Sequence, residues 1–344
     1  MKKFIIKILY YLIPFCCVFG GYKILSKSFT GDIGSLIQFP FGKKYDQLVF
    51  GNYLPNYLTI DTLVVSYEKL QVANTSKILT IGDSFSNQKQ YGFQNYLGHL
   101  LGNNILNIRF KIKEYNQFTT AMALLNSEII DSLNYKIIIL QVANRDAIEK
   151  LCSIDFEMLY EIPKDIDNYY LYEPIAKNRV YDLFDFFAFI RLRLDFENPA
   201  LKHNLKQDCF THPYFSRHLF HYKYDLYFQN TLQTDIDKAK ENLITLSRKF
   251  SEKGIKMIFL LAADKYDVYR PFMTDNSLPV DTIMKGLTKI PDVCVIDTKP
   301  ILQEMVGNGE LDVYLLHDTH WSYKGSEAIA RELLRYIHFF ISNI

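Results

Sequence analysis

The sequence predicts an α/β domain in which helices cover both faces of a parallel sheet. Short apolar runs, rich in Ile, Leu and Val, alternate along the chain with segments whose apolar residues recur at helical spacing. The runs are apolar almost throughout, whereas a strand with one face in water would alternate between apolar and polar residues. Strands of this kind, separated by helices, form parallel sheets buried between two helical layers.

The regular pattern begins at residue 77 and contains three strands before residue 145. The first strand, 78–81, ends at Gly82, and the third, 137–142, is a β-branched run typical of a central strand. The other elements expected in this part are a helix at 91–101, a strand at 104–110 and a helix at 118–133.

Between residues 151 and 235 the regular pattern stops. Phe and Tyr supply 19 of these 85 residues, and the segment is predicted to be an insertion at one edge of the sheet. Its aromatic side chains either form a small core of their own or line a groove beside the site. The pattern resumes with a helix at 237–252 that Gly254 ends, strands at 255–262 and 293–296, and a final helix that Ser322 caps.

An apolar segment at residues 4–25 is predicted to anchor the chain in a membrane. Its uncharged part, 8–22, is 15 residues long, and a membrane-spanning helix needs roughly 20 residues. The segment reaches that length when Lys7 and Lys23 extend their ammonium groups to the two interfaces. The early lysines place the N-terminus inside, so the chain beyond about residue 28 is expected outside the cytoplasm. A cleaved signal peptide and a buried terminal helix are the alternatives.

Composition and charge exclude two classes of protein. The chain has 39 Lys and Arg against 38 Asp and Glu, a net charge of +1. A nucleic-acid partner is therefore excluded, because phosphate contacts need a clustered basic surface. A disordered chain is excluded as well, since a composition that is 49% hydrophobic can bury a core. Five cysteines are too few for a disulfide-built scaffold, although Cys152 and Cys209 could form one bridge.

The first strand leads directly into Gly82-Asp83-Ser84. Ligands of parallel α/β sheets bind at the carboxyl ends of the strands, and Ser84 lies at such an end, where the following helix offers backbone N–H groups to negative charge. Gly82 permits a tight turn. The same three residues also suit an ordinary turn with no chemical role.

A second motif precedes the last helix, where Asp318 and His320 are two residues apart. A serine hydroxyl becomes a good nucleophile when an imidazole takes its proton, and a carboxylate fixes the tautomer of that imidazole. Asp318 and His320 supply both groups. Two alternatives remain: a metal site that includes His317 and His320, and a purely structural pair of histidines.

Together these motifs resemble the SGNH (GDSL-type) hydrolase superfamily. More narrowly, Asp318-Thr319-His320-Trp321 with Gly325 resembles the Asp-x-His-Trp loop of the alginate O-acetylation proteins. The segment 263–269 resembles a Lys- and Tyr-containing segment of the same group. The resemblance covers residues 77–145 and 237–340 and implies a three-layer α/β/α, flavodoxin-like fold.

The resemblance also implies roles for individual residues. Ser84 would be the nucleophile, His320 the general base and Asp318 the group that orients it. The backbone N–H of Ser84 and the side chain of Asn144 would form the oxyanion hole. The superfamily has a second-block glycine as a further donor, and the strand that ends at Arg109-Phe110 lacks it. The further donor would then be the backbone of Arg109 or Phe110, or it would be missing. In the alginate group the Asp-His loop precedes the serine, whereas here the serine comes first.

Four more residues are expected near the substrate. Arg145, Lys265 and Tyr269 follow predicted strands on the same side as Ser84, and Trp321 follows His320 directly. They would bind a charged or hydroxylated substrate, or else form structural ion pairs and packing. No metal and no cofactor is expected.

The expected function is an extracytoplasmic O-acyltransferase, in the first instance an O-acetyltransferase, that modifies a cell-surface polysaccharide. Acetyl-CoA is not exported, so the acyl donor would be a membrane-bound partner protein. One alternative is a carbohydrate esterase or deacetylase that uses the same triad. Another is a non-catalytic protein that binds or assembles polysaccharide.

The chain is accordingly expected to have three parts. Residues 1–27 would form the signal anchor, which contacts the lipid bilayer through residues 4–25. Residues 28–76 would form a membrane-proximal linker, and residues 77–344 the catalytic domain with its insertion at 151–235. This single-pass arrangement places the catalytic domain on the outer, periplasmic side of the inner or plasma membrane.

Overall fold

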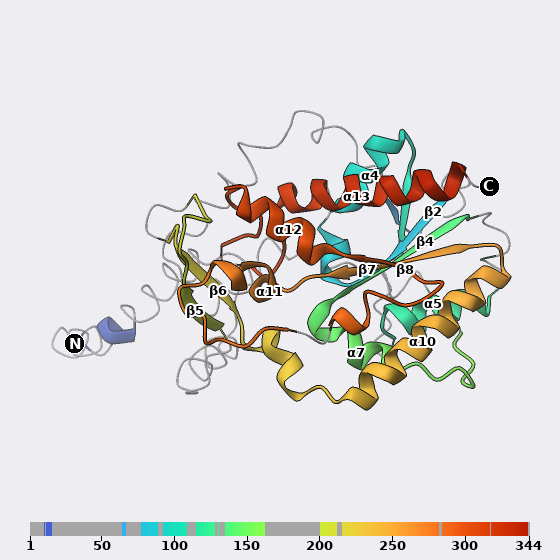
Figure 1. Cartoon of the computed structure of the whole chain (residues 1–344), viewed down its shortest axis with the longest axis horizontal. Helices are drawn as coiled ribbons and strands as arrows, with labels where there is room; N and C mark the ends of the chain where they lie inside the picture. The colour runs from blue at the N-terminus through green and yellow to red at the C-terminus, as the bar shows by residue number, and fades with distance from the viewer. Residues whose placement is uncertain are drawn as a thin grey trace, which may run out of the picture.

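The computed structural model describes residues 77–88, 92–108, 115–127, 135–161, 200–211, 215–281, 284–316 and 318–342, together with residues 10, 12–15, 64–66 and 130. Their centre is a six-stranded sheet (Figure 1). From one edge to the other its strands are β1 (Val64–Ser66), β3 (Ile105–Ile108), β2 (Ile78–Ile81), β4 (Ile137–Ala143), β7 (Lys256–Ala262) and β8 (Cys294–Asp297). Every neighbouring pair is parallel, as expected.

The strand order reverses direction in the middle of the sheet. β3 lies on one side of β2, whereas β4, β7 and β8 follow one another on the other side. Open α/β sheets bind ligands at the carboxyl ends of the strands where the order reverses, which here is between β2 and β4. With β1 set aside, this is the flavodoxin-like order that the resemblance implies.

Helices cover both faces of the sheet, and each layer closes its own hydrophobic cluster (Figure 1). One layer contains α4 (Phe93–Leu101), α12 (Thr298–Gly307) and α13 (Tyr323–Ser342). The other contains α5 (Gln117–Leu125), α7 (Asn144–Cys152) and α10 (Gln233–Glu252). Shorter helices outside the insertion are η3 (Ser84–Asn87), α11 (Lys265–Tyr269), η6 (Arg270–Phe272) and η7 (Met284–Gly286).

Strand β4 shows why its sequence is apolar at nearly every position. Ile137 and Ile139 belong to the first cluster, whereas Ile138 and Leu140 belong to the second. Successive side chains of a strand point to opposite faces, and both faces are buried here. Gln141 is the polar exception, and it lies at the carboxyl end of the strand.

The expected strands and helices of the regular part are confirmed, with shifted ends. α10 begins at Gln233 rather than 237, and Gly254 follows its end with a φ of +71°, which favours glycine. Helices α7 and α12 were not expected. β1 pairs with β3, so the sheet includes three residues of the segment that was assigned to the linker.

The described part of the insertion packs into the main core rather than forming a core of its own. β5 (Ala200–Asn204) and β6 (His218–Tyr222) form an antiparallel hairpin, and η5 (Lys223–Asn230) follows it beside α11 (Figure 1). Phe210 stacks on Tyr269 with ring centroids 5.3 Å apart, and Phe210 shares the first cluster with the sheet. The suggested disulfide is wrong, since Cys152 and Cys209 are both free.

The predicted membrane anchor lies largely outside the described residues, which include only residues 10 and 12–15 of it. Within the described part of the chain, no helix has the length and apolar character needed to cross a membrane.

The packing of α10 gives a first prediction. Leu243 is fully buried in the second cluster, so Leu243→Ala should lower the free energy of unfolding by about 2–5 kcal/mol through lost burial and a cavity. Leu232, just before α10, is 63% exposed, and Leu232→Ala should change it by less than about 0.5 kcal/mol. Denaturant unfolding measures both, and equal effects would contradict this packing.

Candidate active site

Ser84 is exposed at the first position of η3, directly beyond the carboxyl end of β2. The turn is held by the carboxylate of Asp83. Its Oδ1 accepts a hydrogen bond from the backbone N–H of Phe85 at 3.0 Å, and its Oδ2 accepts one from the N–H of Ala143 at 2.7 Å. A single carboxylate therefore ties the ends of β2 and β4 together where the strand order reverses.

Gln141 supports the same turn from below. Its Oε1 accepts hydrogen bonds from the backbone N–H of Asp83 at 3.1 Å and from Oγ of Ser86 at 2.8 Å. This approach leaves no room for a side chain at Gly82, where a Cβ would lie 2.1 Å from Oγ of Ser86 and 2.4 Å from Oε1 of Gln141. Gly82 is therefore required by close contact, since its φ is not in the left-handed region.

Asp318 and His320 form the expected carboxylate–imidazole pair. Oδ1 of Asp318 lies 2.5 Å from Nδ1 of His320 and also accepts the His320 backbone N–H at 3.0 Å. Both side chains are about one-fifth exposed. This hydrogen bond assigns the proton to Nδ1, because a carboxylate only accepts. The Nε2 atom then has the lone pair that a general base needs.

The serine turn and the Asp-His loop meet in space although they are far apart in the chain. The Phe85 ring lies 4.7 Å, centroid to centroid, from both the His320 ring and the Trp321 ring. Nε2 of Gln88 donates to the Trp321 carbonyl at 3.0 Å, and its Oε1 accepts from Oγ of Ser326 at 3.1 Å. The structure thus brings the neighbourhoods of Ser84 and His320 together.

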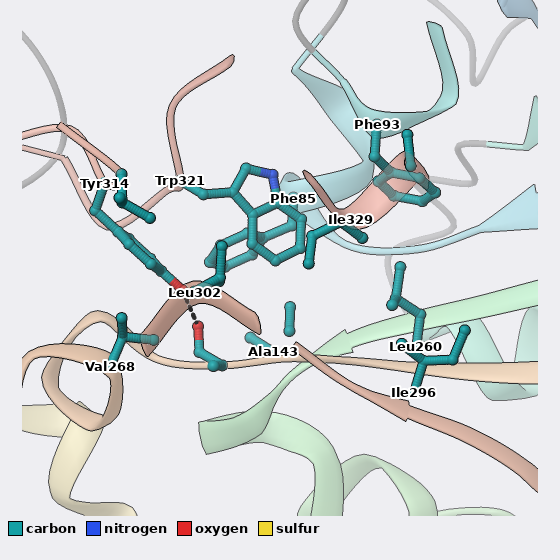
Figure 2. Packing of buried hydrophobic residues seen from close by; sticks show 14 of the residues in the cluster. Phe85, Phe93, Ala143, Leu260, Val268, Ile296, Leu302, Tyr314, Trp321 and Ile329 are labelled. Atoms are coloured by element: carbon teal, nitrogen blue, oxygen red, sulfur yellow. Dashed lines mark hydrogen bonds between the residues drawn. The ribbon is translucent and has the colours of Figure 1, made fainter. Parts of the chain in front are cut away.

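Trp321 packs in the core beneath the loop that carries His320. Its side chain is completely buried, and Figure 2 shows it packed against Phe85 beside Tyr314 and Leu302. A Cβ at Gly325 would lie 2.8 Å from Cβ of Trp321, which explains why a glycine follows the Asp-x-His-Trp motif. The expected contact of Trp321 with substrate stays a prediction, and in this structure its side chain has no exposed surface.

Lys265 and Tyr269 are likewise completely buried, and their expected contact with substrate also stays a prediction. Nζ of Lys265 donates to the carbonyls of Leu315, Leu316 and Asp318. The Tyr269 hydroxyl accepts the backbone N–H of Tyr314 at 3.3 Å. Both residues hold the segment that leads to His320.

Arg145 forms ion pairs within the protein, which was the alternative to binding a substrate. Its Nη1 lies 2.6 Å from Asp264, 3.1 Å from Asp225 and 3.1 Å from Oγ1 of Thr319. Burial lowers the pKa of Arg145, but the two carboxylates outweigh burial and raise it above its ordinary value. Since Lys265 is buried and Arg145 is paired, these two side chains form no exposed positive patch within the part of the chain that the structure describes.

Asn144 is completely buried at the start of α7, where its amide helps to lower the pKa of the Asp267 carboxyl. An oxyanion donor must face the reacting carbonyl, and the Asn144 side chain has no exposed surface in this structure. Its role as an oxyanion donor stays a prediction. Arg109, Phe110 and His317 lie outside the described residues.

A group of buried carboxylates lies beneath these contacts. Burial raises the pKa of Asp267 to about 7, although Lys299, 3.7 Å away, opposes the shift. Burial also raises the pKa of Asp264, against the effect of Arg145. Among the described residues, no group of three or more His, Cys, Asp or Glu side chains is arranged to hold a metal ion.

Comparison with known proteins finds a match in the second half of the chain. Residues 218–338 match the family model of the SGNH hydrolase-like domain of the acetyltransferase AlgX. The match confirms the resemblance for this segment, which contains Lys265, Asp318 and His320. It covers about a third of the chain and does not include Ser84.

The SGNH hydrolase-like domain is an enzyme domain of the hydrolase or acyltransferase kind, so the match supports that class of activity. No curated protein and no solved structure matches the chain.

Sequence reasoning missed two residues that build the site. Gln141 had a detectable signal, because a lone amide in a buried apolar strand must find hydrogen-bond partners. Gln88 had none, since its partners at Trp321 and Ser326 are more than 200 residues away.

The crowding at Gly82 predicts the effect of a single methyl group. Gly82→Ala should lower the free energy of unfolding by about 1–3 kcal/mol, because Ser86 and Gln141 must move to make room. Gly307→Ala in α12 is the control, since its Cβ would meet nothing closer than 3.8 Å. Denaturant unfolding measures both. A Gly82→Ala protein as stable as wild type would show that the turn is looser than described.

The raised pKa of Asp267 predicts a pH dependence. The pKa of an Asp in an unfolded chain is about 4, whereas the pKa of Asp267 in the folded protein is about 7. Its contribution to stability is therefore complete below about pH 4 and is lost as the pH rises through 7. Asp267→Asn should reduce the fall in the free energy of unfolding between about pH 5 and pH 8. Asp237→Asn, at an exposed site on α10, should leave that fall unchanged in urea titrations.

Proposed function

We propose that this protein is an O-acyltransferase, in the first instance an O-acetyltransferase, that acts on a polysaccharide through Ser84, His320 and Asp318. The observation that carries the proposal is the 2.5 Å contact between Asp318 and His320, on a loop that packs against the serine turn. The match of the loop segment to an acetyltransferase domain supports the same reaction class.

The reaction would proceed in two steps through an acyl-enzyme. Nε2 of His320 takes the Ser84 proton as Oγ attacks the donor carbonyl; the C–O bond of the donor breaks, and its alkoxide leaves with that proton. A sugar hydroxyl then gives its proton to His320 and attacks the acyl-serine, and Oγ of Ser84 recovers the proton. The first step requires a hydrogen bond from Oγ of Ser84 to Nε2 of His320, and the proposal adds this contact to the described geometry.

The oxyanion would be held first by the backbone N–H of Ser84, at the start of η3. Asn144 would contribute only if its amide turned outward from the interior. One such donor can supply about 3 kcal/mol of transition-state stabilisation. This assignment makes Ser84 both the nucleophile and the first oxyanion donor.

The compartment and the partners belong to the proposal as well. An anchor at residues 4–25 would hold the domain outside the cytoplasm, on the periplasmic side of the inner or plasma membrane. The acyl donor would be a membrane-bound protein and the acceptor a cell-surface polysaccharide. The apolar character of the segment and its flanking lysines support the anchor.

A second candidate is an esterase that removes acyl groups with the same three residues. Transfer and hydrolysis share the acyl-enzyme and differ in whether a sugar hydroxyl or water attacks it. The third candidate, a polysaccharide-binding or assembly protein, needs no acyl-enzyme at all.

The decisive experiment treats the protein with an activated acetyl ester and measures its intact mass. We expect one acetyl adduct on wild type and on Ser251→Ala, an exposed serine on α10, and no adduct on Ser84→Ala. Asp318→Asn should slow acetylation by roughly 10³–10⁴-fold, because the imidazole loses its tautomer and orientation.

The fate of the acetyl group separates the candidates. Added oligosaccharide that becomes acetylated supports the transferase, whereas free acetate alone supports the esterase. Absence of an adduct on the folded wild-type protein would leave the binding protein.

A further inference from the structure

The loop that carries Asp318 and His320 has little regular structure of its own. Between α12 and α13, the β-pairing in the described part of this loop is one isolated bridge of Tyr314 with Trp321. This bridge consists of two hydrogen bonds: the N–H of Leu315 donates to the His320 carbonyl at 3.1 Å, and the N–H of Ser322 donates to the Val313 carbonyl at 2.9 Å. A general base that must meet a serine needs a more exact support than two backbone contacts, because small misplacements cost large factors in rate.

That support comes from the buried ammonium of Lys265. Its Nζ lies 2.5 Å from the carbonyl oxygen of Leu315, 2.7 Å from that of Leu316 and 3.3 Å from that of Asp318. An ammonium has three N–H donors, and the loop turns three carbonyls toward this one atom. Phe210 adds a ring face, with Nζ 5.3 Å from its centroid.

The burial of Lys265 is costly unless these hydrogen bonds are made. The residue is completely buried, and removing an ammonium from water costs several kcal/mol, by order of magnitude, without compensating partners. An apolar side chain would pack there at lower cost. The Lys265 ammonium therefore holds the loop in place through hydrogen bonds from its three N–H groups.

The preceding residue holds the same loop from the other side. Both carboxylate oxygens of Asp264 bind Arg145, at 2.8 Å to its backbone N–H and 2.6 Å to Nη1. The same Nη1 donates to Oγ1 of Thr319 at 3.1 Å. Thr319 lies between Asp318 and His320, so the fixed guanidinium restrains the centre of the motif.

We propose that Asp264 and Lys265, at the carboxyl end of β7, are positioning residues that hold the Asp318–His320 pair in its working geometry. Lys265 acts through the loop carbonyls, and Asp264 acts through Arg145 and Thr319. Neither touches the substrate. The role in catalysis rests on the proposed function, whereas the role in loop geometry can be tested without it.

The test compares three variants of the full-length protein with wild type. Lys265→Met keeps the apolar stem and removes the three donors, and Thr319→Val removes the hydroxyl that Arg145 binds. Lys299→Met is the matched control, because Lys299 lies 3.7 Å from the buried Asp267 carboxylate but belongs to α12 and not to the loop.

Two measurements are made on each protein, after circular dichroism has shown that it is folded. The first is proton NMR of the ring N–H between His320 and Asp318, a far-downfield resonance that is assigned by its loss in His320→Gln. The second is the rate at which the activated acetyl ester acetylates Ser84. The resonance reports the geometry of the pair and does not depend on turnover.

We expect the resonance to broaden into exchange with water in Lys265→Met and in Thr319→Val. Acetylation should slow by roughly 100-fold in Lys265→Met. Lys299→Met should change neither measurement, even if it unfolds at a lower temperature. A folded Lys265→Met that keeps the wild-type resonance and rate would overturn the proposal.

Two further outcomes are also decisive. If Lys265→Met does not fold, Thr319→Val is the deciding variant, and a wild-type resonance and rate in that protein would overturn the proposal. If wild type shows the resonance but is never acetylated, the proposed function fails, and the resonance in the variants alone decides the positioning role.

Discussion

The site depends on one carboxylate that joins two strands where the sheet reverses its order. Asp83 accepts the N–H of Phe85 in the serine turn and the N–H of Ala143 at the end of β4. Parallel strands end side by side, and their last N–H groups need partners. By accepting one N–H from the turn that follows β2 and the last N–H of β4, Asp83 fixes the place of Ser84. The loops after β4 and β7 are then arranged around that point.

The charges near the site serve construction more than recognition. Arg145 pairs with both Asp264 and Asp225, and Lys265 binds carbonyls. A buried charge is tolerated only when it is paired or hydrogen-bonded, so these residues demand one arrangement of the loops. The exposed Ser84 and the partly exposed His320 remain at the surface of this rigid base.

The sequence predicts those parts of the site whose residues lie close together in the chain. Ser84 follows an apolar strand within three residues, and Asp318 with His320 forms a compact motif. Lys265 was singled out, but its carbonyl partners lie 50 or more residues away, and no local spacing reveals which groups a buried ammonium meets. α7 was missed because its polar sequence resembles a loop, and its burial depends on packing against α10.

The contact between Gln88 and Ser326 links residues 238 positions apart. Contacts of such high sequence separation close late, because the loop-closure entropy must be met before they form. A chain in which α13 has not yet docked would present the serine turn without its histidine. Under the proposed function, folding order would therefore delay activity until the whole domain is assembled, because a partly folded chain lacks the Asp318–His320 pair beside Ser84.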